Sequence, residues 1–368
     1  ILKKLISRVT APNQKEDKAV PLTTSNAIVI LGSSFVGALA FTYSDSFWFN
    51  AVEAEVYAMA SLFISLLFWL GLRWEQDMDS PRGNRWLLII SLVIGLSFGV
   101  HFMALLTIPS IGLLYFFKHY KTVTVKNFII ANVVVVSILL FIFKLLLPLT
   151  MSFFAGTEVF TVNDLGMPFD SGTILVTILL SAAFYFGLKY TNNKGLVTFN
   201  TLILCVLFVL IGFSTWTMLP VRANANVNIN ENKPSDAREV LAYYNREQYG
   251  SNPLFYGPQY TEVFAGLDKD KPYLDKAPNY ERNYKTGRYE IVNNFKNAVQ
   301  NSDDNHKTIL PRMWSTDHIA NYMNFTNAPD FQLNPAYPYE EDLAKYGIDA
   351  SKLSEEDYSR AIGQLNRQ

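Results

Sequence analysis

Cysteine is nearly absent from this chain of 368 residues, which contains one. A single cysteine excludes a disulfide framework and a metal cluster held by cysteines. Cys205 lies inside an apolar run, and we interpret it as a packing residue. A glycine-rich phosphate loop and an HExxH motif are absent as well. Their absence argues against an enzyme that binds a nucleotide sugar or hydrolyses a nucleotide.

A strong net charge is also missing, since the formal net charge is -1. This balance hides a division along the chain. Almost every apolar run precedes Pro220, whereas the remainder is polar, rich in tyrosine and mildly acidic. The acidic surplus after Pro220 argues against nucleic acid as a partner. We interpret the chain as a membrane portion followed by a water-soluble portion.

Long apolar runs, by contrast, are abundant. A helix that crosses a bilayer needs roughly 20 mostly apolar residues. The runs that reach or approach this length are residues 27–43, 56–72, 127–149, 173–188 and 197–219. The run 86–117 is too long for one upright span and short in each half, with Gly99 and Pro109 as break points. It is either a hairpin of two short helices or one strongly tilted helix.

The basic residues favour the hairpin, because Lys and Arg beside membrane helices stay on the cytoplasmic side. Loops 44–55 and 150–172 contain no Lys or Arg. With a hairpin, the opposite side collects Lys3, Lys4, Arg8, Lys15, Lys18, Arg73, Arg82, Arg85, Lys118, Lys121, Lys126, Lys189 and Lys194. We therefore predict about seven helical passes.

The expected fold class is an α-helical integral membrane bundle followed by a soluble α+β external domain. The expected parts are a cytoplasmic basic segment at 1–25, a membrane domain at 26–219 and an external domain at 220–368. In the external domain, a helix capped near Ser235 is expected to end at Gly250, and Ser354 with Asp357 forms a capping box. Short β-like runs lie between them.

The stretch SDSFWFNAVEAEVY, residues 44–57, is the first external loop of this arrangement. It combines Asp45, Glu53 and Glu55 with the aromatic residues Trp48 and Tyr57. Acidic residues are tolerated outside the membrane and aromatic residues are common at its surface, so the stretch has an ordinary structural interpretation. The alternative is functional, because carboxylates at an apolar boundary act as general bases or bind sugar hydroxyls.

Three further polar residues are expected at a comparable depth. His101 lies at the apex of the predicted hairpin, where a lone histidine is more often a packed residue than a ligand. Lys144 lies near Pro148 at the external end of its helix, and Arg222 follows the last helix. Lys144 either extends to the headgroups or neutralises a lipid phosphate, a task that Arg222 could share.

Four blocks in order resemble a bacterial family of large membrane proteins related to animal protein O-mannosyltransferases. The blocks are FVGALAFTYSDSFWFNAVEAEVYAMASLF, GLSFGVHFMALLTIPSIGLLYFFK, REVLAYYNREQYGSNPLFYGPQY and DDNHKTILPRMWS. The resemblance covers most of the chain. It implies the multi-spanning glycosyltransferase architecture called GT-C, with a polyprenyl-phosphate-linked sugar as donor and a catalytic carboxylate in an external acidic loop. The matching residues are Asp45, Glu53, Glu55, Tyr57 and His101.

The chain departs from that family at one place. Members begin with an earlier helix and an acidic loop of the "WD…GE" type, and nothing of that kind precedes Asp45. We therefore expect the chain to be the middle of a longer protein. If the earlier loop carries the base, Glu53 and Glu55 are positioning groups.

The resulting hypothesis is a membrane glycosyltransferase that moves a sugar from a polyprenyl-phosphate-linked donor to a protein or glycan. The catalytic candidates are Glu53, Glu55 and Asp45, and the substrate-binding candidates are Tyr57, His101, Lys144, Arg222 and Trp48. No metal or cofactor is predicted, with a divalent cation left open. The expected location is a bacterial inner membrane, in contact with lipid, with the soluble domain in the periplasm. The alternatives are a non-catalytic subunit of an envelope complex and a lipid or solute transporter.

The predicted topology is testable by cysteine labelling after Cys205 is replaced by serine. A cysteine at Thr157 should react with a membrane-impermeant maleimide from outside, and one at Lys121 only after the membrane is opened, because basic loops stay in the cytoplasm. Labelling of the Lys121→Cys variant in intact cells would contradict the topology.

Overall fold

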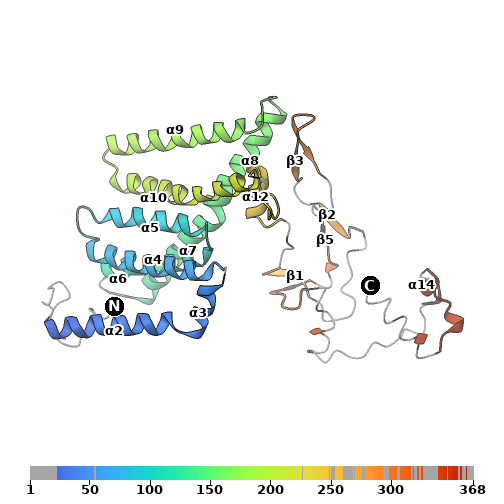
Figure 1. Ribbon diagram of the computed structural model, residues 1–368, viewed down its shortest axis with the longest axis horizontal. Helices are drawn as coiled ribbons and strands as arrows, with labels where there is room; N and C mark the ends of the chain where they lie inside the picture. Colours follow the sequence, from blue (N-terminus) through green and yellow to red (C-terminus); the bar gives the residue numbers. More distant parts are fainter. Residues whose placement is uncertain are drawn as a thin grey trace. The chain divides into compact units, whose positions relative to one another are not determined.

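Figure 1 shows a computed structural model of the chain. It describes residues 23–53, 55–120, 122–225, 227–247, 249, 253–259, 268, 270–275, 278–292, 298–304, 307–315, 318, 321, 322, 325, 339–345, 347–354, 357, 358 and 362. Most of the predicted basic segment 1–25, together with Lys121 and Gly250, lies outside these residues. The chain divides into two units, residues 1–153 with 174–227, and residues 154–173 with 228–368.

The first part of the chain is helical, which confirms the expected membrane bundle. Within the described residues, six helices are long and apolar enough to cross a membrane: Thr24–Thr42, Tyr57–Asp77, Phe102–His119, Val125–Asn163, Ser171–Asn193 and Val197–Ala223. A shorter apolar helix spans Asn84–Ser97. The run 86–117 is therefore broken, as the hairpin interpretation required, with non-helical residues between Ser97 and Phe102. Such a set of helices is the signature of an integral membrane protein.

The helices of the first unit follow one another along the chain, and Figure 1 labels α2 to α10. They are α2 (Thr24–Thr42), α3 (Asp45–Val52), α4 (Tyr57–Asp77), α5 (Asn84–Ser97), η1 (Phe102–Leu106), α6 (Thr107–His119), α7 (Val125–Leu140), η2 (Phe141–Leu146), α8 (Leu147–Asn163), α9 (Ser171–Asn193), α10 (Val197–Phe213), η3 (Ser214–Thr217) and α11 (Met218–Ala223). Helices α8 and α9 each extend from the first unit into the second.

The tightest packing in the first unit joins α5 to α10, where two glycines let the backbones meet. A Cβ atom on Gly95 would lie 2.1 Å from the carbonyl oxygen of Val209, and one on Gly212 would lie 2.4 Å from that of Leu92. The hydrophobic effect between helices is weak in lipid. Small residues at such crossings allow close van der Waals contact, which stabilises the pair instead. On its other side α5 packs against α4, whose Leu67 and Leu70 are buried.

The helix from Val125 to Asn163 is longer than sequence analysis indicated, since 150–172 was expected to be a loop. Its 39 residues would extend about 58 Å, well beyond one span. The apolar run 127–149 was expected to end beside Pro148, and a proline leaves the carbonyl of residue 144 without its helical donor. The segment η2 is a π-helix directly before this proline. The wider turn accommodates Pro148 and the helix continues to Asn163.

The second unit contains short elements. Helix α12 spans Ala237–Tyr244, α14 spans Tyr339–Lys345 and η7 spans Ala350–Lys352. In the described part of this unit, short strands pair into antiparallel ribbons: β1 (Tyr256–Pro258) with β6 (Lys307–Ile309), β2 (Tyr273–Asp275) with β5 (Ala298–Gln300), and β3 (Tyr280–Asn283) with β4 (Arg288–Ile291). The registers pair Tyr256 with Ile309, Tyr273 with Gln300 and Tyr280 with Ile291. The expected small α+β region is confirmed.

The caps of this unit follow the sequence with one shift. The N-cap of α12 is Asp236 rather than Ser235, and its carboxylate accepts hydrogen bonds from the backbone N–H groups of Arg238 and Glu239. Ser235 instead donates to Glu239. One carboxylate oxygen of Asp236 accepts from both helix donors, and a charged acceptor binds backbone N–H groups more strongly than a serine hydroxyl would. The predicted pair of Ser354 and Asp357 is confirmed at 2.7 Å.

Replacing Gly95 by alanine should destabilise the first unit by roughly 1–3 kcal/mol, because the new methyl group would overlap the backbone of α10. The matched control is Gly37→Ala, since no atom lies within 4 Å of a Cβ built there. Thermal unfolding in detergent should show a lower Tm for Gly95→Ala only. Equal Tm values for the two variants would contradict the packing.

Candidate functional site

The acidic stretch forms a helix followed by an open linker. Ser44 and Asp45 begin α3, which ends at Val52, so most of the expected loop is helical. An acidic residue in a first turn stabilises the positive end of a helix, which explains why the aromatic run after Asp45 folds this way. Glu53 and Glu55 lie in the linker between α3 and α4, and both are exposed. As expected, they directly precede the second apolar helix, which begins at Tyr57.

An open pocket of about 260 Å³ adjoins this linker. Phe47 and Asn50 of α3 and Tyr57 and Ser61 of α4 line it. The Asn50 amide nitrogen donates to the carbonyl of Ser46, which fixes the orientation of that side chain. The lining combines two aromatic rings with one amide and one hydroxyl, a composition that suits an uncharged polyhydroxy ligand such as a sugar.

His101 is held in the break between α5 and η1. Its backbone N–H donates to the carbonyl of Ser97, and its Nδ1 accepts from the backbone N–H of Met103 at 3.1 Å. The break in the helix leaves the carbonyl of Phe98 without a helical N–H donor. The indole Nε1 of Trp216 donates to this carbonyl instead, at 2.9 Å. A neutral ring that accepts at Nδ1 carries its proton on Nε2. His101 therefore presents a hydrogen-bond donor rather than a base.

Aromatic contacts connect three of the predicted substrate-binding residues. The ring of Tyr57 lies 5.8 Å from that of His101, which stacks on Phe102 at 4.6 Å. Phe102 lies 5.8 Å from Phe143, and the Lys144 ammonium lies 5.0 Å from the centre of the Phe143 ring. Lys144 is part of the π-turn η2, a feature that is frequent at functional sites. We call Tyr57, His101, Phe102, Phe143 and Lys144 the aromatic path.

The other predicted residues have ordinary structural roles. Trp48 is half exposed and stacks on Tyr43 at 5.6 Å, as expected of a residue in an interfacial belt. Arg222 is exposed in the last turn of α11, where a cation favours the helix dipole. The structure shows no contact that joins Trp48 or Arg222 to the aromatic path among the described residues.

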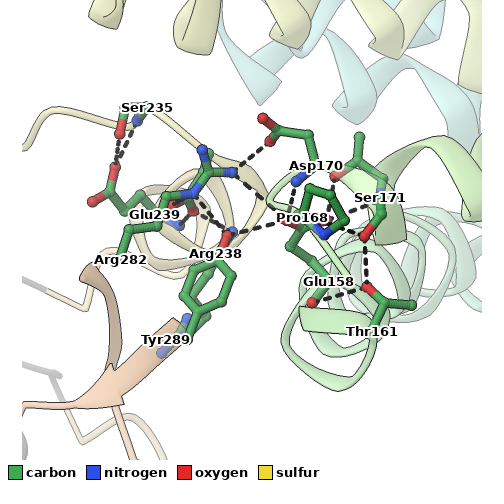
Figure 2. Close-up of polar contacts among 12 residues, drawn as sticks. Glu158, Thr161, Pro168, Asp170, Ser171, Ser235, Arg238, Glu239, Arg282 and Tyr289 are labelled. Atoms are coloured by element: carbon green, nitrogen blue, oxygen red, sulfur yellow. Dashed lines mark hydrogen bonds and ion pairs between the residues drawn. The ribbon is translucent and has the colours of Figure 1, made fainter. Parts of the chain in front are cut away.

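A second polar cluster lies within the second unit (Figure 2), and its centre is Glu158 of α8, which is fully buried. One carboxylate oxygen of Glu158 accepts from the backbone N–H of Asp170 at 2.5 Å, and the other accepts from the N–H and hydroxyl of Thr173 at 3.0 and 3.2 Å. The start of α9 comes so close that a Cβ on Gly172 would lie 2.4 Å from the Cα of Glu158. This close approach requires glycine.

Arg282 of β3 connects Glu158 to the rest of the cluster. Its guanidinium pairs with Asp170, lies 3.7 Å from Glu158 and 2.8 Å from Asp236, and donates to the Tyr289 hydroxyl at 2.9 Å. Although burial lowers the pKa of Arg282, its hydrogen bond to Asp170 and its other partners raise it overall. Burial and the charge of Asp236 raise the pKa of Tyr289. Arg282 therefore stays charged, and Tyr289 stays protonated.

Two more contacts tie this cluster together. The Asn163 side chain donates to the backbone carbonyl of Tyr289 and accepts from its N–H, both at 2.8 Å, so it pairs with β4 as a neighbouring strand would. Burial raises the pKa of Asp236, against the opposing effects of its backbone donors and Arg282. Among the described residues, no group of three His, Cys, Asp or Glu side chains is arranged to hold a metal ion. The cluster holds α8, the start of α9, α12 and the β3–β4 ribbon together.

Sequence analysis missed Phe47, Asn50 and Ser61 of the pocket, and Glu158 of the cluster. Asn50 lies in the quoted acidic stretch, and its amide among aromatic residues was an available signal. Glu158 had a weaker signal, as a carboxylate in a segment without basic residues. Its partner Arg282 is more than a hundred residues away in sequence, and no local sequence pattern predicts such a pair.

The fold and pocket define a helical membrane protein with an exposed acidic linker between α3 and α4. Residues 1–124 match the family model described as "Protein O-mannosyl-transferase TMEM260 N-terminal domain". This segment contains the linker, the pocket and His101, and it supports a glycosyltransferase-like membrane protein. Residues 250–355 match a family of unknown function, DUF8416. No curated protein and no solved structure showed a significant match to the chain.

Glu158→Gln should destabilise the second unit by roughly 1–3 kcal/mol, because the amide cannot accept at both positions and leaves a buried donor unsatisfied. Limited proteolysis should cut within 154–173 and near α12 faster than in the parent protein. Glu281→Gln is the matched control, since Glu281 lies beside Arg282 but is exposed. Equal cleavage rates for Glu158→Gln and the parent would show that the cluster does not hold the unit together.

Proposed function

We propose that the chain is part of a membrane glycosyltransferase that moves a sugar from a polyprenyl-phosphate-linked donor to a hydroxyl group of a protein or glycan. The observation that carries the proposal is the continuous group formed by the acidic linker, the pocket and the aromatic path. Most of this group lies within the segment that matches the O-mannosyl-transferase family model.

Lys144 is the group best suited to the donor phosphate. Its ammonium lies over the Phe143 ring, and this cation–π contact stabilises the positive charge beside the aromatic path. During transfer, the bond between the sugar anomeric carbon and the phosphate oxygen breaks, and polyprenyl phosphate leaves with the electron pair. A positive charge at that oxygen stabilises the departing phosphate.

The pocket and His101 would hold the sugar. Tyr57 and Phe47 offer aromatic faces, and Asn50 and Ser61 offer hydrogen-bonding groups for hydroxyls. The Nε2 proton of His101 suits an acceptor oxygen on the sugar or phosphate. In this role His101 orients the donor and does not take up a proton.

A carboxylate of the acidic linker is proposed to act as the base. Glu53 and Glu55 lie within four residues of the pocket residue Tyr57, and their exposure gives an acceptor hydroxyl access to them. As the acceptor oxygen bonds to the anomeric carbon, its proton passes to the carboxylate. Asp45, in the first turn of α3, is assigned to electrostatic support of the oxocarbenium-like sugar. The proposed setting is the external face of a bacterial inner membrane.

Sugar transfer from polyprenyl-phosphate donors should fall by roughly 10²–10⁴-fold in whichever of Glu53→Gln and Glu55→Gln removes the base. The control is Glu290→Gln, an exposed carboxylate of β4 that should leave transfer unchanged. Full activity in both linker variants would remove the base assignment. An inactive parent chain would instead favour the alternative of a non-catalytic subunit.

His101 offers a sharper distinction between two roles. The amide nitrogen of glutamine can take the place of Nε2 as a donor, so His101→Gln should retain more transfer activity than His101→Ala. A general base would be lost equally in both variants. Equal loss in both, together with an acidic limb in the pH profile of the parent that vanishes in both, would contradict the donor role.

A further inference from the structure

A pair of arginines converges on one indole where α4 ends and α5 begins. The guanidinium carbons of Arg73 and Arg85 each lie 5.3 Å from the centre of the Trp86 ring. Arg73 and Trp69 are one helical turn apart on α4 and both are exposed, and the Trp69 ring meets Trp86 edge-on at 6.3 Å. We call Trp69, Arg73, Arg85 and Trp86 the arginine–tryptophan corner.

The charges in this corner are not balanced. Asp77 accepts from the Trp86 indole at 2.7 Å and lies 3.5 Å from the Arg85 guanidinium. Arg73 reaches the Gln76 amide oxygen at 3.4 Å, and no carboxylate of the described residues lies within ion-pair distance of it. Two cations and one anion leave one uncompensated positive charge, which corresponds to the single negative charge of a phosphodiester.

The acidic residue of the turn after α4, Asp79, is already engaged with two side chains of α6. Asp79 lies 3.6 Å from the Lys118 ammonium and 3.5 Å from His119 Nε2, and the Lys118 ammonium also donates to the backbone carbonyl of Glu75 at 3.0 Å. Asp79 is therefore committed to α6. It does not supply the missing charge at Arg73.

The composition of the corner fits a lipid better than a soluble anion. Tryptophan lies preferentially at the level of the lipid headgroups, with its ring against the acyl chains. A guanidinium that stacks on an aromatic ring still directs its N–H groups outward and binds phosphate through two of them. The exposed Trp69 ring gives an apolar surface beside the cations, which a free phosphate would not use.

We propose that the arginine–tryptophan corner binds the phosphate headgroup of an anionic phospholipid. Arg73 and Arg85 contact the phosphodiester, and Trp69 and Trp86 contact the glycerol and the upper acyl chain. The site is separate from the pocket of the proposed glycosyl transfer and does not depend on that activity.

The test uses the full chain in nanodiscs of phosphatidylcholine, with or without phosphatidylglycerol. Phosphatidylglycerol should raise the Tm of the parent by several degrees and remain bound in native mass spectrometry. Arg73→Gln combined with Arg85→Gln should reduce that retention roughly tenfold, through the loss of charge-assisted contacts. Arg82→Gln is the control, since Arg82 is exposed in the same turn but lies outside the corner.

Two further variants separate binding from folding. Asp77→Asn removes the competing anion while keeping an acceptor for Trp86, so it should increase retention of phosphatidylglycerol. Arg73→Lys keeps the charge but loses the planar fork and should reduce retention. The proposal is overturned if the Arg82 variant loses as much lipid as the double variant, if Asp77→Asn lowers retention, or if inorganic phosphate alone raises the Tm equally.

Discussion

The first unit depends on giving a hydrogen-bond partner to every backbone N–H and C=O group that lipid hydrocarbon would leave without one. Between Ser97 and Phe102 the helix is interrupted, and each exposed amide or carbonyl at membrane depth would cost several kcal/mol. The protein fills these positions from its own side chains, with the Trp216 indole on Phe98 and the His101 ring on Met103. Because the histidine ring serves as a capping group, its tautomer and its direction follow from the backbone. The hydrogen-bonding role of His101 therefore follows from its position as a capping group at the helix break.

The second unit must also supply partners to buried polar groups, and here these groups are charged carboxylates. Glu158 and Asp236 are almost completely buried, and burial without partners would be very costly. Arg282 lies within ion-pair distance of both, and backbone N–H groups donate to both carboxylates as well. Such a network contributes little net stability but penalises every alternative arrangement, since any shift leaves a buried charge without a partner. It therefore defines how short strands with little core are attached to residues 154–173 of the same unit.

Hydropathy and turn residues were sufficient for the helices and for the break near Gly99, because both depend on local composition. The extension of α8 to Asn163 could not be predicted in the same way. A proline normally ends a helix, and only the π-turn before Pro148 changes that outcome. The candidate site was found in part. Tyr57, His101 and Lys144 proved to be connected, whereas the rings that connect them, Phe102 and Phe143, had no signal beyond their apolar character.

The π-turn around Lys144 also limits how the length of this helix can change. A π-turn holds one residue more than an α-turn. Removing a residue within 141–146 would restore regular winding and bring the ring of Pro148 against a backbone carbonyl of the preceding turn. The extra residue is therefore what allows an unbroken helix on both sides of a proline.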